Sequence, residues 1–263
     1  MSAGREQSRL VAFAGIVDEA ARTAQAIPQL TLKEDLSPAD AYTVQQASVE
    51  RRLRRGERRV GIKMGLTSRA KMTQVGVAEV IWGRLTDAMR LEEGGTLHLD
   101  RYVHPRIEPE VAFLLKTELS GEVSPLEAMA AVAAVSPARE VIDSRYRNFK
   151  FSLADVIADN ASSAGFVLGG WCDPETEIGN LGMILEVDGR PQQIGSSAAI
   201  LGHPLRSLVA AARMMGRAGE ALQSGWIVLA GAATEACPLQ AGTHVRTEVE
   251  RLGAVAIRVG AGG

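Results

Sequence analysis

Aromatic residues, cysteine and net charge are all scarce in this chain of 263 residues. Aromatics make up 4% of the sequence, and 29 basic residues stand against 31 acidic ones, for a formal net charge of −2. A dedicated nucleic-acid-binding protein needs a basic excess for phosphate contacts and aromatic side chains for base stacking. The composition therefore argues against nucleic acid as a partner.

Several sequence signals of other protein classes are also missing. No apolar run approaches the roughly 20 residues that span a bilayer, and the N-terminus has no signal-like apolar segment. Cys172 and Cys237 have no partners at zinc-ligand spacing. The HExxH, GxSxG and GxGxxG patterns do not occur, so nothing supports a zinc protease, a serine hydrolase or a dinucleotide-binding enzyme. We expect a cytoplasmic protein that makes no membrane contact.

The N-terminal quarter is predicted to be helical. Apolar residues between positions 10 and 24 recur at three- and four-residue steps, which places them on one face of a helix that must end near Pro28. A second helix is expected from the cap Ser37-Pro38 to Gly56. Six arginines crowd residues 51–59. A solvated helix terminus explains them better than an anion or RNA patch, because no basic stripe continues elsewhere.

From residue 60 onward the pattern predicts strands and turns. Two helices interrupt it, one from Ser124-Pro125 along an alanine-rich face to Val132 and one over about residues 204–215. The β-branched runs are residues 60–62, 111–115, 141–142, 183–187, 227–229, 244–249 and 255–259. The expected fold class is α+β, with a small helical region over residues 1–59 on a mixed-sheet domain over residues 60–263.

The stretch from His104 to Phe113 is the most informative, because it contains Glu108-Pro109-Glu110. Carboxylates at positions i and i+2 of a strand share a face, where they repel each other unless a cation lies between them. Pro109 cannot donate to a ladder, which predicts an edge or bulged strand. A solvent-facing pair is the simpler interpretation. The apolar run that follows favours a core position and a hard divalent cation such as Mg²⁺, which takes oxygen ligands.

A protein-held Mg²⁺ site with open positions needs a third carboxylate, and Glu140 is the best candidate. It begins a short apolar strand directly after a helix. A local ion pair with Arg139 is the alternative interpretation of Glu140. Asp143 is the second choice as a ligand, but its odd spacing from Glu140 puts it on the opposite face of a strand.

Two further segments carry polar residues in apolar surroundings. Lys63 is flanked by glycines within an apolar strand, where a buried ammonium needs an anion. That anion is either a substrate carboxylate or enolate, or a structural carboxylate of the protein. Residues 155–163 contain aspartate, asparagine and serine in close succession, which predicts either a turn with a helix cap or a carboxylate-binding loop.

Taken together and in this order, residues 61–68, 107–110 and 155–163 resemble the fumarylacetoacetate-hydrolase superfamily. Within it they are similar to the branch of 2-hydroxypenta-2,4-dienoate hydratases and 4-oxalocrotonate decarboxylases of aromatic catabolism. The likeness extends over nearly the whole chain. Residues 63–72 and 142–151 are more similar to the decarboxylase side of this branch.

The resemblance implies a site as well as a fold. The fold is a mixed β-roll, Glu108, Glu110 and Glu140 hold Mg²⁺ or Mn²⁺, and Lys63 is the catalytic residue. Arg145, Lys150 and residues 160–163 are candidates for holding a distal carboxylate of the substrate. The residues expected to contact the substrate are Leu66, Thr67, Ser68, Arg145, Asp159, Asn160, Ser162 and Ser163.

The activity implied is metal-dependent decarboxylation of 2-oxo-3-hexenedioate, a 2-oxo dicarboxylate, to 2-hydroxypenta-2,4-dienoate and CO₂ in meta-cleavage aromatic catabolism. The alternative is the hydratase of the same branch, which adds water to that dienoate. The resemblance also implies a homo-oligomer and a complex with such a hydratase. A third hypothesis, a non-catalytic partner, is the weakest, because such a protein should have lost the metal carboxylates.

Overall fold

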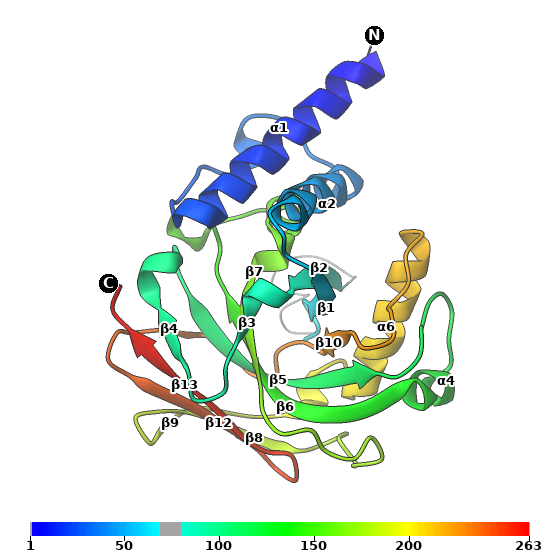
Figure 1. Ribbon diagram of the computed structural model, residues 1–263, viewed down its shortest axis with the longest axis vertical. Coiled ribbons are helices and arrows are strands. Elements are labelled where there is room, and N and C mark those ends of the chain that lie inside the picture. The colour runs from blue at the N-terminus through cyan, green and yellow to red at the C-terminus, as the bar shows by residue number, and fades with distance from the viewer. Residues whose placement is uncertain (1, 69–79, 263) are drawn as a thin grey trace.

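Two long helices form the N-terminal part of the chain, α1 over Ser2–Thr23 and α2 over Pro38–Arg54. The structure is a computed structural model that describes residues 2–68 and 80–262. Ser37 begins α2 as predicted, because its hydroxyl accepts the N–H of Asp40 while the Asp40 carboxylate accepts the N–H of Ser37. Both helices lie at one end of the molecule (Figure 1).

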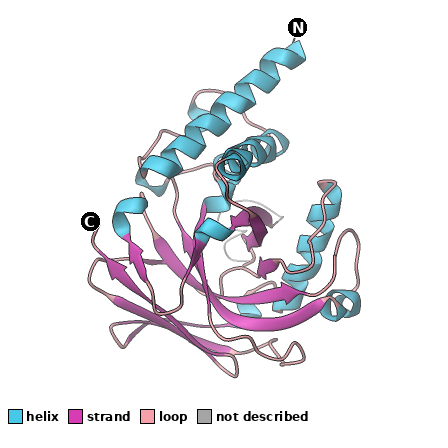
Figure 2. Ribbon diagram, viewed as in Figure 1, coloured by secondary structure: helices cyan, strands magenta, loops and turns pink. Residues whose placement is uncertain are grey.

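The rest of the described chain consists of short helices and many strands. The helices are α4 (Pro125–Ala130), α5 (Leu153–Ala158) and α6 (Pro204–Arg217). The strands are β1 (Arg59–Gly65), β2 (Ile81–Thr86), β3 (Arg90–Leu91), β4 (Thr96–His98), β5 (Arg106–Leu115), β6 (Val132–Ile142), β7 (Ser163–Leu168), β8 (Gly182–Val187), β9 (Arg190–Ser196), β10 (Ile227–Leu229), β11 (Cys237–Pro238), β12 (His244–Val249) and β13 (Gly253–Gly260). Figure 2 shows the helices along two sides of these strands.

The described strands form two sheets. The larger one has the order β2-β1-β10-β5-β6-β7-β3, with β11 also paired to β5, and it mixes parallel and antiparallel pairs. The smaller one has the order β4-β13-β12-β8-β9. Apolar residues such as Ile107 and Val141 of the larger sheet pack against Leu185 and Val255 of the smaller one. The predicted α+β class with a mixed, curled sheet is confirmed, whereas the boundary between residues 59 and 60 stays a prediction.

Strand β5 lies inside the larger sheet, so the prediction of an edge or bulged strand at Pro109 is wrong. β6 pairs with β5 along its full length, and Pro109 lies opposite Arg139 without a local register shift. On the other side, the C=O of Pro109 accepts the N–H of Ala233, which belongs to the loop between β10 and β11. The imide nitrogen faces the same way as this C=O. The missing donor therefore falls opposite a loop rather than opposite a strand.

The helix that begins at Ser124 is shorter than predicted. Ser124 and Glu127 form the expected capping box, but α4 ends at Ala130 and β6 begins at Val132. The alanines of the predicted face lie in α4 or at its C-cap Ala131, and only Val132 belongs to the strand. Pairing of Val132 with Leu115 of β5 explains why the helix does not continue.

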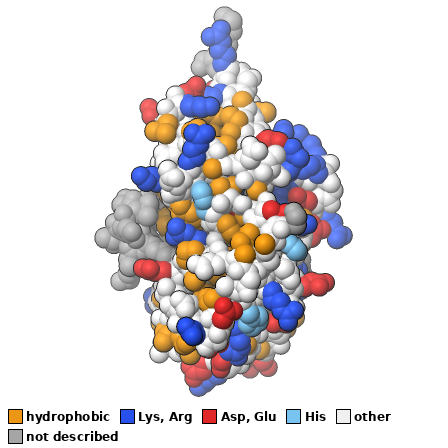
Figure 3. All heavy atoms as spheres, turned by 90° about the vertical axis from the view of Figure 1, so that its left-hand side faces the viewer, with side chains coloured by type: hydrophobic (Ala, Val, Ile, Leu, Met, Phe, Trp, Pro, Cys, Tyr) orange, Lys and Arg blue, Asp and Glu red, His pale blue; other side chains and the backbone are white. Residues whose placement is uncertain are grey.

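The arginines of residues 51–59 are paired rather than merely solvated. Arg51 and Arg55 both contact the buried carboxylate of Asp18 on α1. The other pairs are Arg52 with Glu57, Arg54 with Glu50, Arg58 with Asp87, and Arg59 with Glu220. Acidic and basic side chains are likewise interspersed on the face drawn in Figure 3. Among the residues described, no helix has the length and apolar character needed to cross a membrane.

Asp18 ties α1 to the end of α2, and its removal should weaken the fold in a pH-dependent way. Burial alone would raise the pKa of Asp18, but hydrogen bonds from Arg55 and Arg51 outweigh it and hold this pKa below its ordinary value. The ion pairs therefore stabilise the native state above the unfolded-state pKa of about 4, and this contribution is lost as pH falls through the native-state pKa. We expect Asp18→Asn to lower the free energy of unfolding by about 1–3 kcal/mol at pH 7.

Urea denaturation of both proteins at pH 7 and near pH 3 measures this difference. It should shrink at the lower pH, because the wild-type carboxylate is protonated there as well. Glu19→Gln is the matched control, since Glu19 pairs with Arg22 on the exposed side of the same helix. A difference that is equal at both pH values would contradict the assignment.

Candidate metal centre

Three glutamates converge on one face of the β5–β6 pair. Glu108 of β5 lies directly opposite Glu140 of β6, and Glu110 follows on the same face of β5. One carboxylate oxygen from each lies within 4.8 Å of the others, and all three side chains are buried. The register of two antiparallel strands therefore brings Glu140 to the pair of glutamates recognised in the sequence.

Lys63 supplies the one cationic group that contacts this cluster among the described residues. Its Nζ lies 2.8 Å from Oε2 of Glu140 and donates to the C=O of Ala161 at 3.1 Å. Burial alone would lower the pKa of Lys63, but Glu140, Glu108 and Glu110 together outweigh it and raise this pKa above its ordinary value. Lys63 is therefore an ammonium in the folded protein.

Within the described residues, one ammonium faces three buried carboxylates. Oε2 of Glu110 accepts the N–H of Gly231 at 2.8 Å, whereas its Oε1 is buried and accepts no hydrogen bond from a described residue. Burial first, and then repulsion by Glu140 and Glu108, raise the pKa of Glu110 well above its ordinary value. Burial also raises the pKa of Glu140, although Lys63 opposes this. A bound divalent cation would offset the excess negative charge and use the unsatisfied oxygen, so the residues present fit a hard metal ion.

The alternatives for Glu140 are answered by the strand faces. Arg139, its neighbour in sequence, points to the smaller sheet, where its guanidinium donates to Oγ1 of Thr247 and the C=O of Val245. Asp143, the second choice as a ligand, accepts the N–H groups of Val103 and His104 and lies outside the glutamate cluster. Glu140 therefore forms no local ion pair with Arg139.

A left-handed turn at residues 160–162 supports Lys63. Asn160, Ala161 and Ser162 have φ angles of 52°, 52° and 58°. This conformation costs about 1–2 kcal/mol for each residue that is not glycine. The Asn160 amide offsets part of the cost, because its Oδ1 accepts the N–H of Arg84 at 2.7 Å and its Nδ2 donates to the C=O of Arg84 at 2.8 Å. The turn thereby directs the C=O of Ala161 at the lysine.

Close approach of this turn to β2 requires a glycine at position 83. A Cβ added there would lie 2.4 Å from the carbonyl oxygen of Asn160. Gly83 is also the β2 partner of Lys63 in the β1–β2 register. The turn and the lysine therefore meet across one strand position that carries no side chain.

Arg145 and Asp159, both expected to contact the substrate, bind each other. The Asp159 carboxylate accepts both the backbone N–H and the Nε–H of Arg145, and Nη2 of Arg145 donates to the C=O of Asp159 at 2.7 Å. Burial raises the pKa of Asp159 to about 7, against the opposing effect of Arg145. With the Asn160 amide engaged by β2, these three residues have partners within the protein and fix the start of the turn.

The other residues predicted to contact the substrate range from fully buried to exposed. Leu66 has a φ of 55° after β1, and Thr67 is buried, with its C=O accepting the N–H of Leu201. Ser162 and Ser163 are both buried. Ser163 lies beside Glu140, and Ser162 follows Ala161, whose C=O accepts from Lys63. The Ser162 hydroxyl has no hydrogen-bond partner among the described residues. Lys150 is exposed.

Gly231 belongs to this site but is not evident from the sequence. Its φ is +107°, and a Cβ there would lie 2.1 Å from Oγ1 of Thr67. Its N–H donates to Glu110, so this glycine packs Thr67 against the carboxylate cluster. The available signal was a glycine directly after the apolar run 227–230, which marks a sharp turn but not its neighbours.

Comparisons with known proteins match most of the chain. The fumarylacetoacetate (FAA) hydrolase C-terminal family matches residues 76–260. A 4-oxalocrotonate decarboxylase from Pseudomonas sp. is 57% identical over 239 residues, which cover 91% of this chain and 93% of that protein. A 2-keto-4-pentenoate hydratase from Paraburkholderia xenovorans is 35% identical, with 84% of this chain and 83% of that protein covered.

Solved structures agree with these sequence matches. The 4-oxalocrotonate decarboxylase from Pseudomonas putida G7, complexed with magnesium and adipate, superimposes with a TM-score of 0.93 at 37% identity. The match covers 96% of this chain and 97% of that one. The same enzyme complexed with calcium and acetate gives a TM-score of 0.92 at 35% identity. The chain therefore belongs to the fumarylacetoacetate hydrolase family.

Proposed function

We propose that this protein is a metal-dependent carboxy-lyase that converts 4-oxalocrotonate (2-oxo-3-hexenedioate) to 2-hydroxypenta-2,4-dienoate and CO₂. The observation that carries the proposal is the buried cluster of three glutamates around one ammonium. The relative at 57% identity, named 4-oxalocrotonate decarboxylase, supports this choice of substrate. The related decarboxylase structure contains adipate, which has the saturated six-carbon skeleton of the proposed substrate.

Glu108, Glu110 and Glu140 would hold Mg²⁺ or Mn²⁺ in this enzyme, since their oxygens are close together and unbalanced in charge. When bound, the ion would supply Lewis-acid polarisation of the carboxylate and ketone oxygens at the 2-oxo end of the substrate. The protein's own part is to turn these three carboxylates to one face, which the β5–β6 register does. Lys63 opposes the rise in pKa that burial causes and so favours their ionised forms.

Lys63 would act on the charge that develops during the reaction. The bond between C5 and the distal carboxylate breaks, and its electron pair moves through the conjugated carbons to the oxygen on C2. A proton on that oxygen completes the enol product. A fixed ammonium stabilises this oxygen's negative charge without reorganisation of solvent. Glu140 and the C=O of Ala161 hold Lys63 for this role.

The substrate carboxylates need donors in the same region. We propose Thr67, Ser68, Ser162 and Ser163 for this purpose, together with the backbone around Leu66. Ser162 is the best supported, because its buried hydroxyl has no partner among the described residues, whereas the Ser163 hydroxyl lies beside Glu140. Arg145, Asp159 and Asn160 act instead as positioning residues that hold the 160–162 turn.

A second candidate activity is the hydration of 2-hydroxypenta-2,4-dienoate. It is favoured by relatives named as hydratases, such as the one at 35% identity. Association with a hydratase and self-association stay predictions from the sequence, as does the cytoplasmic location. The predictions below separate the two activities and test the metal and lysine assignments.

Replacing one carboxylate should uncouple the protein from the metal. We expect Glu110→Gln to weaken Mg²⁺ binding at least about 100-fold and to abolish Mg²⁺-dependent turnover, because it removes a charged ligand from the set. Without metal, the same variant should melt at a higher temperature than the wild type, since it removes a buried like charge. Titration calorimetry and thermal melts with and without Mg²⁺ measure both effects. Glu118→Gln, an exposed change on the loop after β5, is the control, and unchanged Mg²⁺ affinity in Glu110→Gln would refute the ligand assignment.

Removing the ammonium should reduce catalysis while metal binding remains. Lys63→Met keeps the stem of the side chain. We expect the variant to lose about 2–4 kcal/mol of transition-state stabilisation, which is measured as a lower kcat/KM. Steady-state decarboxylation assays at saturating Mg²⁺ measure the loss. Lys116→Met removes an exposed lysine and should leave the rate unchanged. A Lys63→Met enzyme within a few-fold of the wild type would make this lysine structural.

Inhibition by unreactive acids should distinguish decarboxylase from hydratase. A decarboxylase must accept carboxylates at both ends of a six-carbon chain, whereas the hydratase substrate has one. We expect six-carbon dicarboxylates such as adipate to inhibit at least about tenfold more strongly than five-carbon monocarboxylates, because each charge-assisted contact contributes about 1.5–3 kcal/mol before desolvation. Equal inhibition, combined with water addition and no release of CO₂, would assign the protein as the hydratase.

A further inference from the structure

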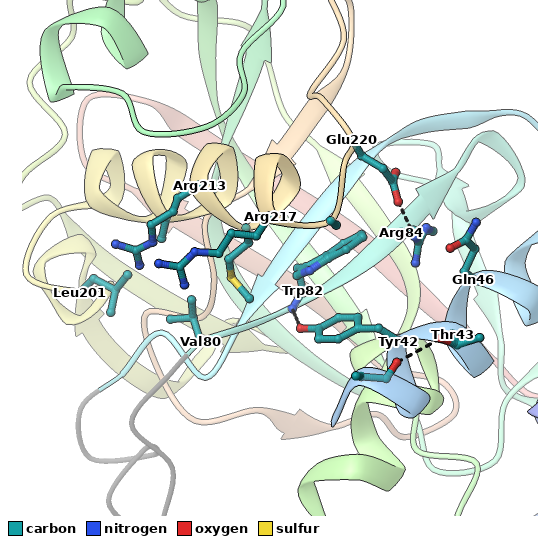
Figure 4. A pocket seen from close by; sticks show the side chains of 14 residues that line it. Tyr42, Thr43, Gln46, Val80, Trp82, Arg84, Leu201, Arg213, Arg217 and Glu220 are labelled. Atoms are coloured by element: carbon teal, nitrogen blue, oxygen red, sulfur yellow. Dashed lines mark hydrogen bonds and ion pairs between the residues drawn. The ribbon is translucent and has the colours of Figure 1, made fainter. Parts of the chain in front are cut away.

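A cavity of about 610 Å³ lies between α2 and α6, with Val80 and the strand β2 as its floor. Its volume is in the range of about 300–1,000 Å³ that is typical of small-molecule sites. Figure 4 shows side chains from both helices and from β2 directed into this space. Neither Lys63 nor any of the three glutamates lines it.

The β1–β2 pair separates this cavity from the carboxylate cluster. Lys63 pairs with Gly83, and Met64 pairs with Trp82 in the same register. Successive side chains of a strand point to opposite faces, so Trp82 shares the face of Met64 and points away from Lys63. The cavity therefore lies on the face of the β1–β2 pair that is opposite to Lys63.

The floor of the cavity is flat and aromatic. The rings of Tyr42 and Trp82 are stacked with centroids 5.3 Å apart and an angle of 22° between their planes. The Arg84 guanidinium lies 4.5 Å from the Trp82 ring centroid on one side of this stack. Nη2 of Arg84 donates to Glu220 at 2.6 Å, and Arg59 forms an ion pair with the same carboxylate. The stacked rings make this part of the cavity suited to a planar group.

The opposite end of the cavity carries two more positive charges, both on the last turns of α6. Arg213 and Arg217 are one turn apart on α6, and Figure 4 shows their guanidinium groups side by side. Among the described residues, Arg213 forms no ion pair and its Nε is buried without a hydrogen-bond partner. Arg217 forms an ion pair with Glu122 at 4.0 Å, in which both side chains are largely exposed. Like charges at positions i and i+4 destabilise a helix unless an anion compensates them.

We propose that this cavity is a second ligand site, specific for a small aromatic carboxylate. The ring lies against the Tyr42–Trp82 stack, and the carboxylate binds between Arg213 and Arg217. A planar guanidinium binds a carboxylate through two parallel hydrogen bonds, so the two arginines together also select for an acid over a neutral ring. The site needs neither the metal nor Lys63.

Calorimetric titration with benzoate tests the proposal, with benzamide as the neutral isostere. We expect one benzoate per chain, and benzamide should bind at least about tenfold more weakly. Arg213→Gln should weaken benzoate binding about fivefold, and Arg213→Gln with Arg217→Gln about twentyfold or more. Arg54→Gln is the control for the single variant Arg213→Gln. It also removes one positive charge, at an exposed position outside the cavity, and should leave the benzoate affinity unchanged.

The Glu110→Gln protein separates this site from the metal centre. Benzoate binding that persists in Glu110→Gln, and weakens only with the α6 arginines, supports the second site independently of the proposed decarboxylase activity. Binding that is lost in Glu110→Gln but kept in the double arginine variant would place the acid at the metal centre and overturn the proposal. Equal affinity for benzoate and benzamide would also overturn it. A third result would overturn the proposal as well: the wild type binds no benzoate, and an arginine variant has a different mass in analytical ultracentrifugation. The two arginines would then form a contact between protein chains.

Discussion

Three buried carboxylates around one ammonium are the electrostatic constraint on which the site depends. Burial raises the pKa of both Glu110 and Glu140, and repulsion by the neighbouring carboxylates adds to this effect. Their arrangement results from backbone hydrogen bonding between β5 and β6, which places Glu108 opposite Glu140. A slip of one residue in this register would turn Glu140 to the smaller sheet and Arg139 to the cluster.

Residues around the cluster are used mainly to hold other residues. The Asn160 side chain donates to and accepts from the backbone of β2, and the Arg145–Asp159 pair fixes the residue directly before it. At the other end of the turn, the C=O of Ser162 accepts the N–H of Asp143. The strain of three left-handed residues is thus held by polar contacts that are themselves buried. Such strain is typical of functional sites, where surrounding structure compensates an unfavourable backbone. Its result here is one carbonyl oxygen directed at Lys63.

Strand β2 lies between the glutamate cluster and the cavity lined by α2 and α6. On one face, Gly83 allows the 160–162 turn to approach, and on the other Trp82 lines the cavity between α2 and α6. Both features come from one alternating strand, in which a glycine and a tryptophan are neighbours. Chemistry and the proposed recognition of an aromatic acid are thereby assigned to opposite sides of a single sheet.

The sequence by itself determined what depends on neighbours within a few residues. The caps at Ser37 and Ser124 and the common face of Glu108 and Glu110 follow from local hydrogen bonding and strand geometry, and all are present in the structure. Glu140 and Lys63 were candidates from their surroundings in the sequence, each with an open alternative, and the family resemblance implied their metal-binding and catalytic roles. Only the tertiary structure decided that Pro109 lies in a central strand, that Arg145 binds Asp159, and that Gly231 packs against Thr67. These outcomes depend on pairing between segments far apart in the chain, and local propensity does not encode which segments will meet.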